Sequence, residues 1–243
     1  MTTSTPNCPY DKPPVIVAIE GLCYSGKSTL IHHLAARLHP IIAPEYTDLA
    51  TLPPWPPTDH SQVDAALRQF LHLDQQRARQ VRTRIASRVH AAGACRSEVV
   101  LLDRSPLTLI AHEYGMQALG VPADPDGAAT LYAGAAAAGQ ILTPNAYLYL
   151  TIPEPVADAR RAARGPVAAH LDDPAVRARI DQTCRTWLRL LPPRRRLILD
   201  GTAPPSLLAT TAAAFITSLG GPPVPSWQLL AKHRTASESG APS

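Results

Sequence analysis

The hydrophobic residues of this chain fall into short apolar runs that alternate with longer segments of helical period. Apolar runs bounded by turn residues are typical of buried strands, and helices between them favour a parallel sheet that is covered on both faces. The runs are Val15 to Ile19, Val99 to Leu102, Ala146 to Ile152 and Leu197 to Leu199, with a weaker candidate at Ile41 to Ala43. The pattern therefore predicts an α/β fold.

Two of the helical segments are clear from the spacing of their apolar residues. Leu30, Leu34 and Leu38 recur at every fourth position, which predicts a helix shortly after the first strand. A longer pattern of the same kind extends from Val63 to Val89, with arginines on its other faces. We therefore expect one long helix in the first half of the chain.

Composition separates the two ends of the chain from its middle. Residues 1–13 and 221–243 are rich in Pro, Ser, Thr and Gly, which is typical of flexible tails. Residues 51–57 (TLPPWPP) exclude a helix or a central strand and predict a rigid loop. The chain as a whole is 45% hydrophobic and 17% charged, so it is able to build a core, and we expect one domain over residues 14–220.

Charge and cysteine content narrow the class of protein. The net charge of +4 is small for a nucleic-acid-binding protein, and the arginines are scattered along the chain. The four cysteines form no C-x-x-C pair, which indicates a reducing compartment. The amino terminus lacks a signal-peptide pattern, and the uncharged stretch 127–153 is divided by Gln140, Pro144 and Asn145. We therefore expect a cytoplasmic protein that neither spans a membrane nor binds nucleic acid.

A phosphate-binding loop follows the first predicted strand. The segment from Gly21 to Thr29 (GLCYSGKST) satisfies G-x-x-x-x-G-K-[ST] between a strand and a helix. In such a loop, successive N–H groups point at phosphate oxygens, the lysine supplies a mobile charge and the hydroxyl binds Mg²⁺. A glycine turn that only caps the helix is the alternative. The donor-binding residues that we expect are Gly21, Tyr24, Ser25, Gly26, Lys27, Ser28 and Thr29, with Lys27 on the β- and γ-phosphates and Ser28 on Mg²⁺.

Charged residues also end the strand predicted at residues 99–102. Asp103 is placed to hold Mg²⁺ directly or through water, and Arg104 beside it to stabilise a transferring phosphate. Alternatively, Asp103 caps a helix that begins at Pro106, and Arg104 forms a surface ion pair. Asp103 is therefore a candidate metal ligand, and both residues are candidate catalytic residues.

A third charged group follows the strand predicted at residues 146–152. Arg160, Arg161 and Arg164 precede a break at Gly165, which suits a lid that closes over phosphates and excludes water. A solvated helix face is the alternative, because arginine is common throughout the chain. We expect a lid over about residues 160–175, with Arg161 and Arg164 as catalytic residues.

Four motifs point to a family. They are Ile19-Glu20-Gly21, Asp103-Arg104-Ser105, the segment from Tyr147 to Arg164, and Leu199-Asp200-Gly201-Thr202. In their order and spacing, over residues 15 to about 216, the sequence resembles the thymidylate kinase and deoxynucleoside kinase group of P-loop kinases. The resemblance implies a P-loop three-layer sandwich, with a five-stranded parallel sheet flanked by helices and a lid segment. It also implies ATP as donor, Mg²⁺, and a homodimer, which is common in this group.

The kind of acceptor depends on Glu45. Deoxynucleoside kinases carry a Glu-Pro pair after the second strand, whose glutamate acts as base on a sugar hydroxyl; here the order is Pro44-Glu45. Thymidylate kinases tend to have an arginine there that grips the acceptor's phosphate. Between Lys27 and Arg68 this chain has only Arg37, on the first helix. A hydroxyl needs a base and a phosphate needs cations, so Glu45 favours the hydroxyl of a nucleoside or related metabolite.

Other interpretations of the acceptor site stay open. Glu45 is alternatively an exposed loop acid, and arginines of the long helix are able to hold a monophosphate, as in a thymidylate-kinase-like enzyme. Those arginines are Arg68, Arg77, Arg79, Arg82, Arg84 and Arg88. Tyr46, Trp55 and Phe70 are candidates for stacking on a base, or for ordinary packing.

The sequence also departs from the group that it resembles. Cys23 and Tyr24 replace smaller or acidic loop residues, and we expect Tyr24 to project toward the acceptor. The lid lacks the glutamate that often follows its arginines, with Asp172 and Asp173 as later substitutes. These departures raise the alternative of a kinase for an unusual alcohol, including an antibiotic. A regulatory NTPase is a further alternative, but the chain has no N-K-x-D-like motif.

Overall fold

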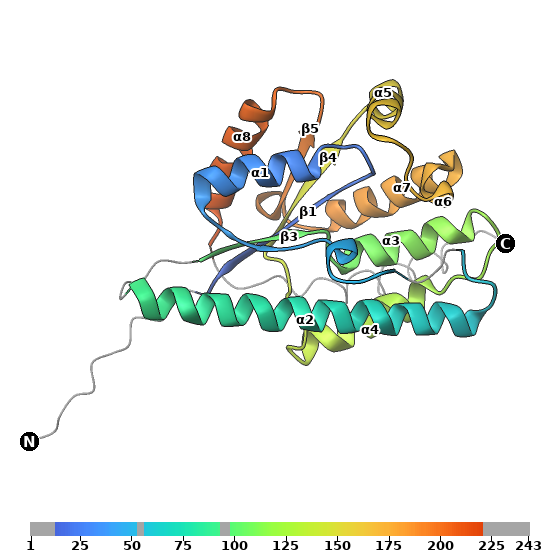
Figure 1. The fold of residues 1–243 in the computed structure, drawn as a ribbon, viewed down its shortest axis with the longest axis horizontal. Coiled ribbons are helices and arrows are strands. Elements are labelled where there is room, and N and C mark those ends of the chain that lie inside the picture. Colours follow the sequence, from blue (N-terminus) through green and yellow to red (C-terminus); the bar gives the residue numbers. More distant parts are fainter. Residues whose placement is uncertain (1–12, 53–55, 93–97, 221–243) are drawn as a thin grey trace, which may run out of the picture.

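The computed structural model describes residues 13–52, 56–92 and 98–220 (Figure 1). Apart from Pro13, the tails expected at the two ends lie outside the described residues, and so does Trp55. The described part of the proline-rich loop contains neither helix nor strand, as predicted.

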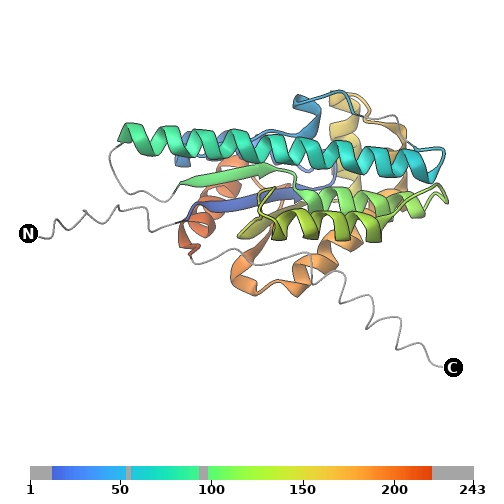
Figure 2. The ribbon, with the colours of Figure 1, turned by 90° about the horizontal axis from the view of Figure 1, so that it is seen from below.

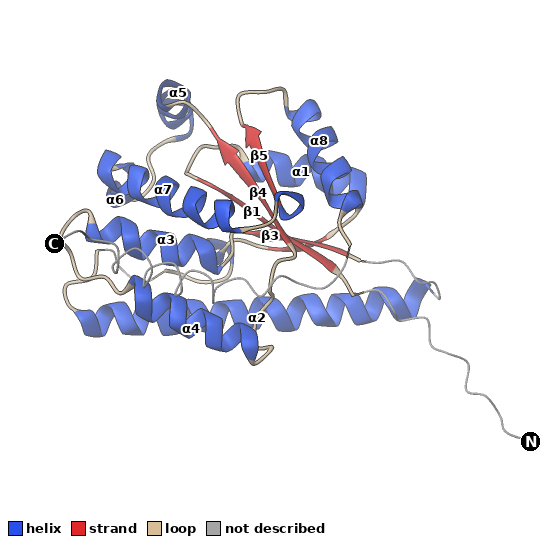
Figure 3. Ribbon diagram, turned by 180° about the vertical axis from the view of Figure 1, so that it is seen from behind, coloured by secondary structure: helices blue, strands red, loops and turns tan. Residues whose placement is uncertain are grey.

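The described strands form one parallel sheet, which confirms the predicted fold class. Its order is β2-β3-β1-β4-β5, and every neighbouring pair is parallel (Figure 3). The strands are β1 (Val15–Gly21), β2 (Ile41–Ala43), β3 (Val99–Asp103), β4 (Ala146–Thr151) and β5 (Arg196–Asp200). All five lie where the apolar runs predict them, with ends that differ by at most two residues.

Helices connect the strands, and most of them begin at or beside a proline, whose fixed φ and missing N–H suit a first helical turn. They are α1 (Lys27–Leu38), α2 (His60–Ala92), α3 (Pro106–Gln117), α4 (Pro125–Ala137), α5 (Glu154–Arg164), α6 (Ala169–Asp172), α7 (Pro174–Leu190) and α8 (Pro205–Ser218). Two short 3₁₀ turns, Tyr46–Asp48 and Pro193–Arg195, precede α2 and β5. The predicted long helix is α2, which runs along one side of the molecule (Figure 2).

The two faces of the sheet carry separate cores, because successive side chains of a strand point to opposite faces. On β1, Val17 and Ile19 pack with α1 and α8. Ile16 and Ala18 face the other way, into the larger core formed with α2, α3, α4 and α7. The fold therefore has the three layers that the resemblance implies (Figure 1).

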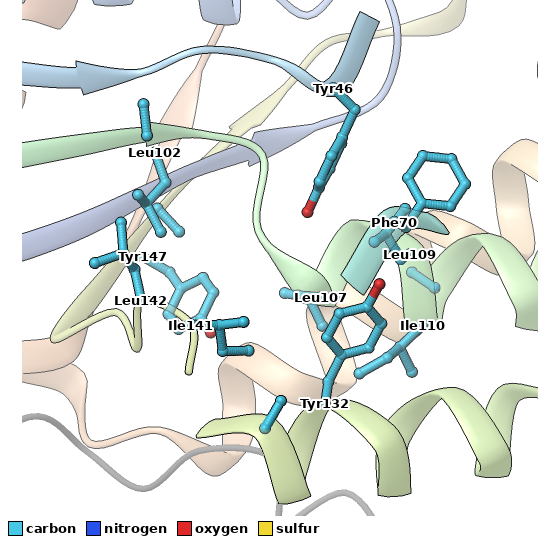
Figure 4. Packing of buried hydrophobic residues seen from close by; sticks show 14 of the residues in the cluster. Tyr46, Phe70, Leu102, Leu107, Leu109, Ile110, Tyr132, Ile141, Leu142 and Tyr147 are labelled. Atoms are coloured by element: carbon cyan, nitrogen blue, oxygen red, sulfur yellow. The ribbon is translucent and has the colours of Figure 1, made fainter. Parts of the chain in front are cut away.

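The larger core is rich in aromatic side chains. Tyr46 and Phe70 meet edge to face, with ring centroids 5.3 Å apart, and Tyr132 approaches from α4 (Figure 4). Tyr147 of β4 contacts Trp187 of α7 in the same way at 6.3 Å. Aromatic pairs of this geometry add to the stabilisation by burial alone.

The uncharged stretch 127–153 divides between α4 and β4, as the sequence predicts. Within the described part of the chain, no helix combines the length and the apolar character needed to cross a bilayer.

The parallel arrangement determines where a site is able to form. The carboxyl ends of parallel strands meet at one edge of a sheet, and ligands of such folds bind at that edge. The phosphate-binding loop, Glu45, Asp103 and Gly201 all follow or end a strand there.

Candidate active site

The phosphate-binding loop requires its glycines for close packing. Gly21 has φ +143°, and a Cβ on it would lie 2.6 Å from the carbonyl oxygen of Leu150. Gly26 adopts φ +101° at the start of α1. These conformations favour glycine, and they bring the loop to the amino-terminal end of α1, where a helix favours anions.

Lys27 lies buried at the centre of the loop. Its Nζ donates to the carbonyl oxygens of Gly21 at 2.9 Å and Leu22 at 3.0 Å. The pKa of Lys27 is lowered to about 8, mainly by burial and then by the positive charge of Arg104. The lysine is therefore held inside the loop by neutral carbonyl groups, with no carboxylate in direct contact among the described residues.

The residues suited to Mg²⁺ are Ser28 and Asp103. Ser28 is exposed on the first turn of α1. Within the described chain, Oδ1 of Asp103 is buried without a hydrogen-bond partner, an arrangement that is costly unless a ligand satisfies the oxygen. Burial raises the pKa of Asp103, and the negative charge of Glu45 raises it further. A hydroxyl and a carboxylate oxygen are donors of the type that Mg²⁺ prefers, so the residues fit the metal.

The turn after β3 differs from the capping interpretation. Ser105, not Asp103, is the N-cap of α3, since its Oγ accepts from the backbone N–H of Leu107 at 3.2 Å. Arg104 adopts the left-handed region with φ +64°. The capping role for Asp103 was therefore wrong. Strand β3 continues through Asp103, and α3 begins only at Pro106.

Arg104 and Glu45 form an ion pair. Nε of Arg104 donates to Oε1 of Glu45, and its Nη2 lies 3.9 Å from the sulfur of Cys23. Burial raises the pKa of Glu45, but the Arg104 charge outweighs this effect and holds the pKa below its usual value. Burial likewise lowers the pKa of Arg104, and the Glu45 carboxylate reverses this to a net rise. Both groups are therefore charged at neutral pH.

A cavity of about 300 Å³ opens beside this ion pair. The loop contributes Gly21 to Cys23, the lid contributes Leu171, and Tyr46 and Phe70 form an apolar wall. Its charged lining residues are Glu20, Glu45, Arg104, Glu113 and Arg177, joined by His112 and His170. The cavity therefore combines an apolar interior with a carboxylate and a guanidinium beside the phosphate-binding loop.

Glu20 is a charged residue in an otherwise apolar strand. Its carboxylate is 1% exposed and accepts from the backbone N–H of Ser105 at 2.9 Å, from the Ser105 hydroxyl at 2.6 Å and from the Thr108 hydroxyl. Burial raises the pKa of Glu20, while these hydroxyl groups lower it. Glu20 is therefore a link between β1 and α3 as well as part of the cavity wall.

Tyr24, which we expected to project toward an acceptor, does not line this cavity. Its backbone is left-handed, with φ +64°, and its hydroxyl donates to the carbonyl oxygen of Gly165 in the lid at 2.9 Å. The side chain lines a separate pocket of about 230 Å³ between the loop and α5 to α7. The expected direction was therefore wrong: the loop tyrosine is turned to the lid.

The three lid arginines have different surroundings. Arg160 donates at 2.8 Å to the carbonyl oxygens of both Tyr24 and Gly201, so it joins α5 to the phosphate-binding loop. Arg161 pairs with Asp158 at 2.7 Å and Asp172 at 3.2 Å. Arg164 is exposed and makes no hydrogen bond or ion pair with any described residue.

Asp172 thus neutralises a lid arginine, while Asp173 caps α7 by accepting from the N–H of Ala175 at 2.8 Å.

The α2 arginines do not line the cavity beside the Glu45–Arg104 ion pair. Arg68 pairs with Asp64 on the exposed face, and Arg82 donates to the carbonyl of Gly139. Arg84 and Arg88 bind backbone carbonyls near β2, Arg79 is exposed, and Arg77 is buried beneath the turn after β3.

The sequence did not single out Glu20 or Arg177 as site residues, and it placed Arg160 in the lid without separating it from Arg161 and Arg164. For Glu20 the sequence offers one signal, a glutamate inside a buried strand. For the arginines it offers none, because the direction of each side chain depends on how the helix is rotated about its axis.

Comparisons with known proteins place this fold. No protein-family model matches the sequence, and no curated protein matches it either. A structure of deoxyadenosine kinase from M. mycoides with the products dCMP and dCDP has a TM-score of 0.51 and 14% identity, and the match covers 84% of this chain and 100% of that chain. A dCTP-bound structure of deoxyadenosine kinase from M. mycoides matches with the same TM-score and coverage at 12% identity.

A thymidylate kinase from Candida albicans matches with a TM-score of 0.56 and 16% identity, over 85% of this chain and 92% of that chain. Identities this low speak for the architecture rather than for the substrate. The parallel sheet of this chain and its flanking helices match the fold of both kinds of kinase, as the motifs predict. This chain therefore has the fold of the P-loop kinases that it resembles.

Proposed function

We propose that this protein is an ATP-dependent kinase that transfers the γ-phosphoryl group to the hydroxyl of a small acceptor, a (deoxy)nucleoside or a related metabolite. The observation that carries the proposal is the ion pair between Glu45 and Arg104 on the wall of the cavity beside the phosphate-binding loop. A base and a cation are there adjacent to both a donor loop and a space for an acceptor.

The donor would bind to the loop backbone from Gly21 to Thr29, with Lys27 on its β- and γ-phosphates. Lys27 would exchange two carbonyl partners for phosphate oxygens. Ser28 and Asp103 would hold Mg²⁺, which neutralises charge on the phosphates when it is bound. The contacts of Arg160 would keep the lid against the loop. Arg161 and Arg164 stay predictions as catalytic residues, and Arg161 would first have to leave its carboxylate partners.

Glu45 would act as the base. The acceptor hydroxyl gives its proton to the Glu45 carboxylate, and its oxygen bonds to the γ-phosphorus as the bond to the β–γ bridging oxygen breaks and ADP leaves. Arg104 lies beside this carboxylate, where it would stabilise charge on the transferring group. Because its pKa is held low, Glu45 is ionised and able to accept the proton at neutral pH.

The charges around the cavity favour a hydroxyl over a monophosphate. Arg104 is paired with Glu45, and Arg177 is paired with Glu154 and, at 3.9 Å, with Asp158. A phosphomonoester would need unpaired cations, since its double negative charge must be compensated once it leaves water.

Transfer from [γ-³²P]ATP tests the proposal directly. Deoxyadenosine, thymidine, dTMP and an aminoglycoside serve as acceptors, and we expect label on a nucleoside or another alcohol. For that acceptor, Glu45→Gln is expected to lower kcat by on the order of 10²- to 10⁴-fold, with little change in the KM for ATP. Asp48→Asn is the matched control, because Asp48 is an exposed acid of the same turn. Label on dTMP alone, with a normal rate in the Glu45→Gln enzyme, would contradict the proposal.

A further inference from the structure

Arg77 is a buried cation outside the reaction centre proposed above. It lies in the middle of α2, is 1% exposed and does not line the acceptor cavity. Removing a guanidinium from water is costly unless it is paired and hydrogen-bonded. The contacts of Arg77 therefore show which parts of the fold depend on it.

The guanidinium of Arg77 connects two strand ends. Its Nη1 pairs with Oδ1 of Asp74 at 2.9 Å, one turn earlier on α2. Its Nη2 donates to the carbonyl oxygens of Asp103 and Arg104, each at 2.9 Å, and lies 3.4 Å from that of Ala43. One side chain thus binds the last residue of β2 and the turn that follows β3.

A tyrosine extends this network to the residue next to Glu45. The Tyr46 hydroxyl donates to Oδ2 of Asp74 at 3.0 Å, and the Arg77 guanidinium lies over the Tyr46 ring, 4.7 Å from its centroid. The ring is itself held by Phe70. The backbone that carries Glu45 is therefore fixed from α2 on both sides, through Ala43 and Tyr46.

The other partner of the ion pair is fixed in a conformation that needs support. Arg104 has φ +64°, which is unfavourable for a residue with a Cβ. Two of the carbonyl groups that accept from Arg77 are those of Arg104 itself and of Asp103, the residue before it. The donor contacts therefore stabilise the backbone that presents Arg104 to Glu45.

We propose that Arg77 is a positioning residue, which holds the end of β2 against the turn after β3 so that Glu45 and Arg104 meet at the acceptor cavity. The inference rests on the proposed function of that pair. Lysine at this position keeps the charge but lacks the planar fork that reaches Asp74 and the turn together.

A double-mutant cycle tests the role, in the full-length protein with [γ-³²P]ATP and either deoxyadenosine or thymidine. We expect Arg77→Lys to lower kcat by about 10- to 100-fold and to leave the KM for ATP within about twofold, as a small misplacement of reacting groups does. In the Glu45→Gln background the same change is expected to cost less than about threefold, because the base to be positioned is gone. Arg79→Lys, an exposed arginine of the same helix, is the control.

A merely structural role gives a different result in the same cycle. Loss of folded protein would lower kcat by the same factor in both backgrounds, and this outcome would overturn the inference, as would a normal kcat for Arg77→Lys. If Arg77→Lys does not fold, Tyr46→Phe replaces it in the cycle, since that change removes only the hydroxyl that binds Asp74.

A second cycle needs no acceptor and separates this inference from the proposed function. If neither nucleoside is phosphorylated, the proposed function fails for nucleosides, and urea unfolding then decides the role of Arg77. We expect the unfolding constants of the single and double variants to depart from multiplicative behaviour by about threefold or more, because Arg77 and Glu45 act on the same turn. Effects that multiply within about twofold would overturn the coupling.

Discussion

Lys27 is the side chain on which the proposed binding of the donor would depend most directly. It is buried among loop carbonyls and is the cation that the donor's phosphates would meet first. We expect Lys27→Ala to lower turnover by on the order of 10²- to 10³-fold and to leave the fold intact, because it removes one preorganised charge. Label transfer and far-UV circular dichroism measure the two effects, with Arg79→Ala as control. Full ATP-dependent activity in the Lys27→Ala enzyme would rule out the donor site described above.

The same lysine sets a pH dependence. Its pKa of about 8 means that Lys27 loses its charge as the pH rises through that value. We expect kcat/KM for ATP to fall correspondingly on the alkaline side, because a neutral amine attracts phosphates less. Glu45 adds no acid limb above about pH 5, since its pKa is held below the usual range. A profile of kcat/KM that stays flat to about pH 10 would contradict this assignment.

Single residues also show how far sequence patterns reach. The spacing of Gly21, Gly26 and Lys27 predicts the loop, because the backbone conformation needs the two glycines and phosphate oxygens attract the lysine. The direction of Tyr24 was not predictable, since it depends on a left-handed φ at a residue that rarely adopts it. The role of Arg77 depends on carbonyl groups more than 25 residues away, which no local pattern contains.

At the scale of elements, the conformation of the proposed lid depends on one glycine. Gly165 ends α5 with φ +89° and ψ 166°, a region that is essentially restricted to glycine, and its carbonyl accepts from Tyr24. We expect Gly165→Ala to raise the KM for ATP severalfold, because the strain separates the lid from the loop. Gly139→Ala is a matched control, as Gly139 also has positive φ but lies after α4. Equal KM values for the two variants would show that the lid contact does not matter for the donor.

Elements were predicted where the apolar period is strong. Leu30 and Leu34 of α1 are buried and Leu38 is partly buried, while the runs of β1 and β3 are buried beyond their first residues, Val15 and Val99. The arginine that meets the loop was not predicted, because Arg160 and Arg161 are neighbours whose directions differ by about 100° around the helix. Only the packing of α5 against the loop selects Arg160.

At the scale of the molecule, stability comes from the two cores on either face of the sheet. Leu34 is fully buried between the sheet and α1, whereas Leu207 of α8 is 56% exposed. We expect Leu34→Ala to lower the free energy of unfolding by about 2–5 kcal/mol and Leu207→Ala by less than about 0.5 kcal/mol. Urea denaturation measures both. A loss for Leu34→Ala as small as that for Leu207→Ala would mean that this face of the sheet contributes little to the stability.

The overall architecture was the most predictable level, because strand runs, helix lengths and loop motif all agree with one topology. The homodimer that the resemblance implies stays a prediction, since assembly depends on surfaces that no internal pattern specifies.

Glu20 has a consequence for the synthesis of the protein. The groups that donate hydrogen bonds to its buried carboxylate, on Ser105 and Thr108, follow it by 85 and 88 residues. Until they emerge from the ribosome, this carboxylate near the end of an apolar strand has only water as a partner, and dehydrating it costs several kcal/mol. We expect a nascent chain that ends before Thr108 to leave β1 unburied. The phosphate-binding loop, although encoded near the start, is then among the parts that the growing chain completes late.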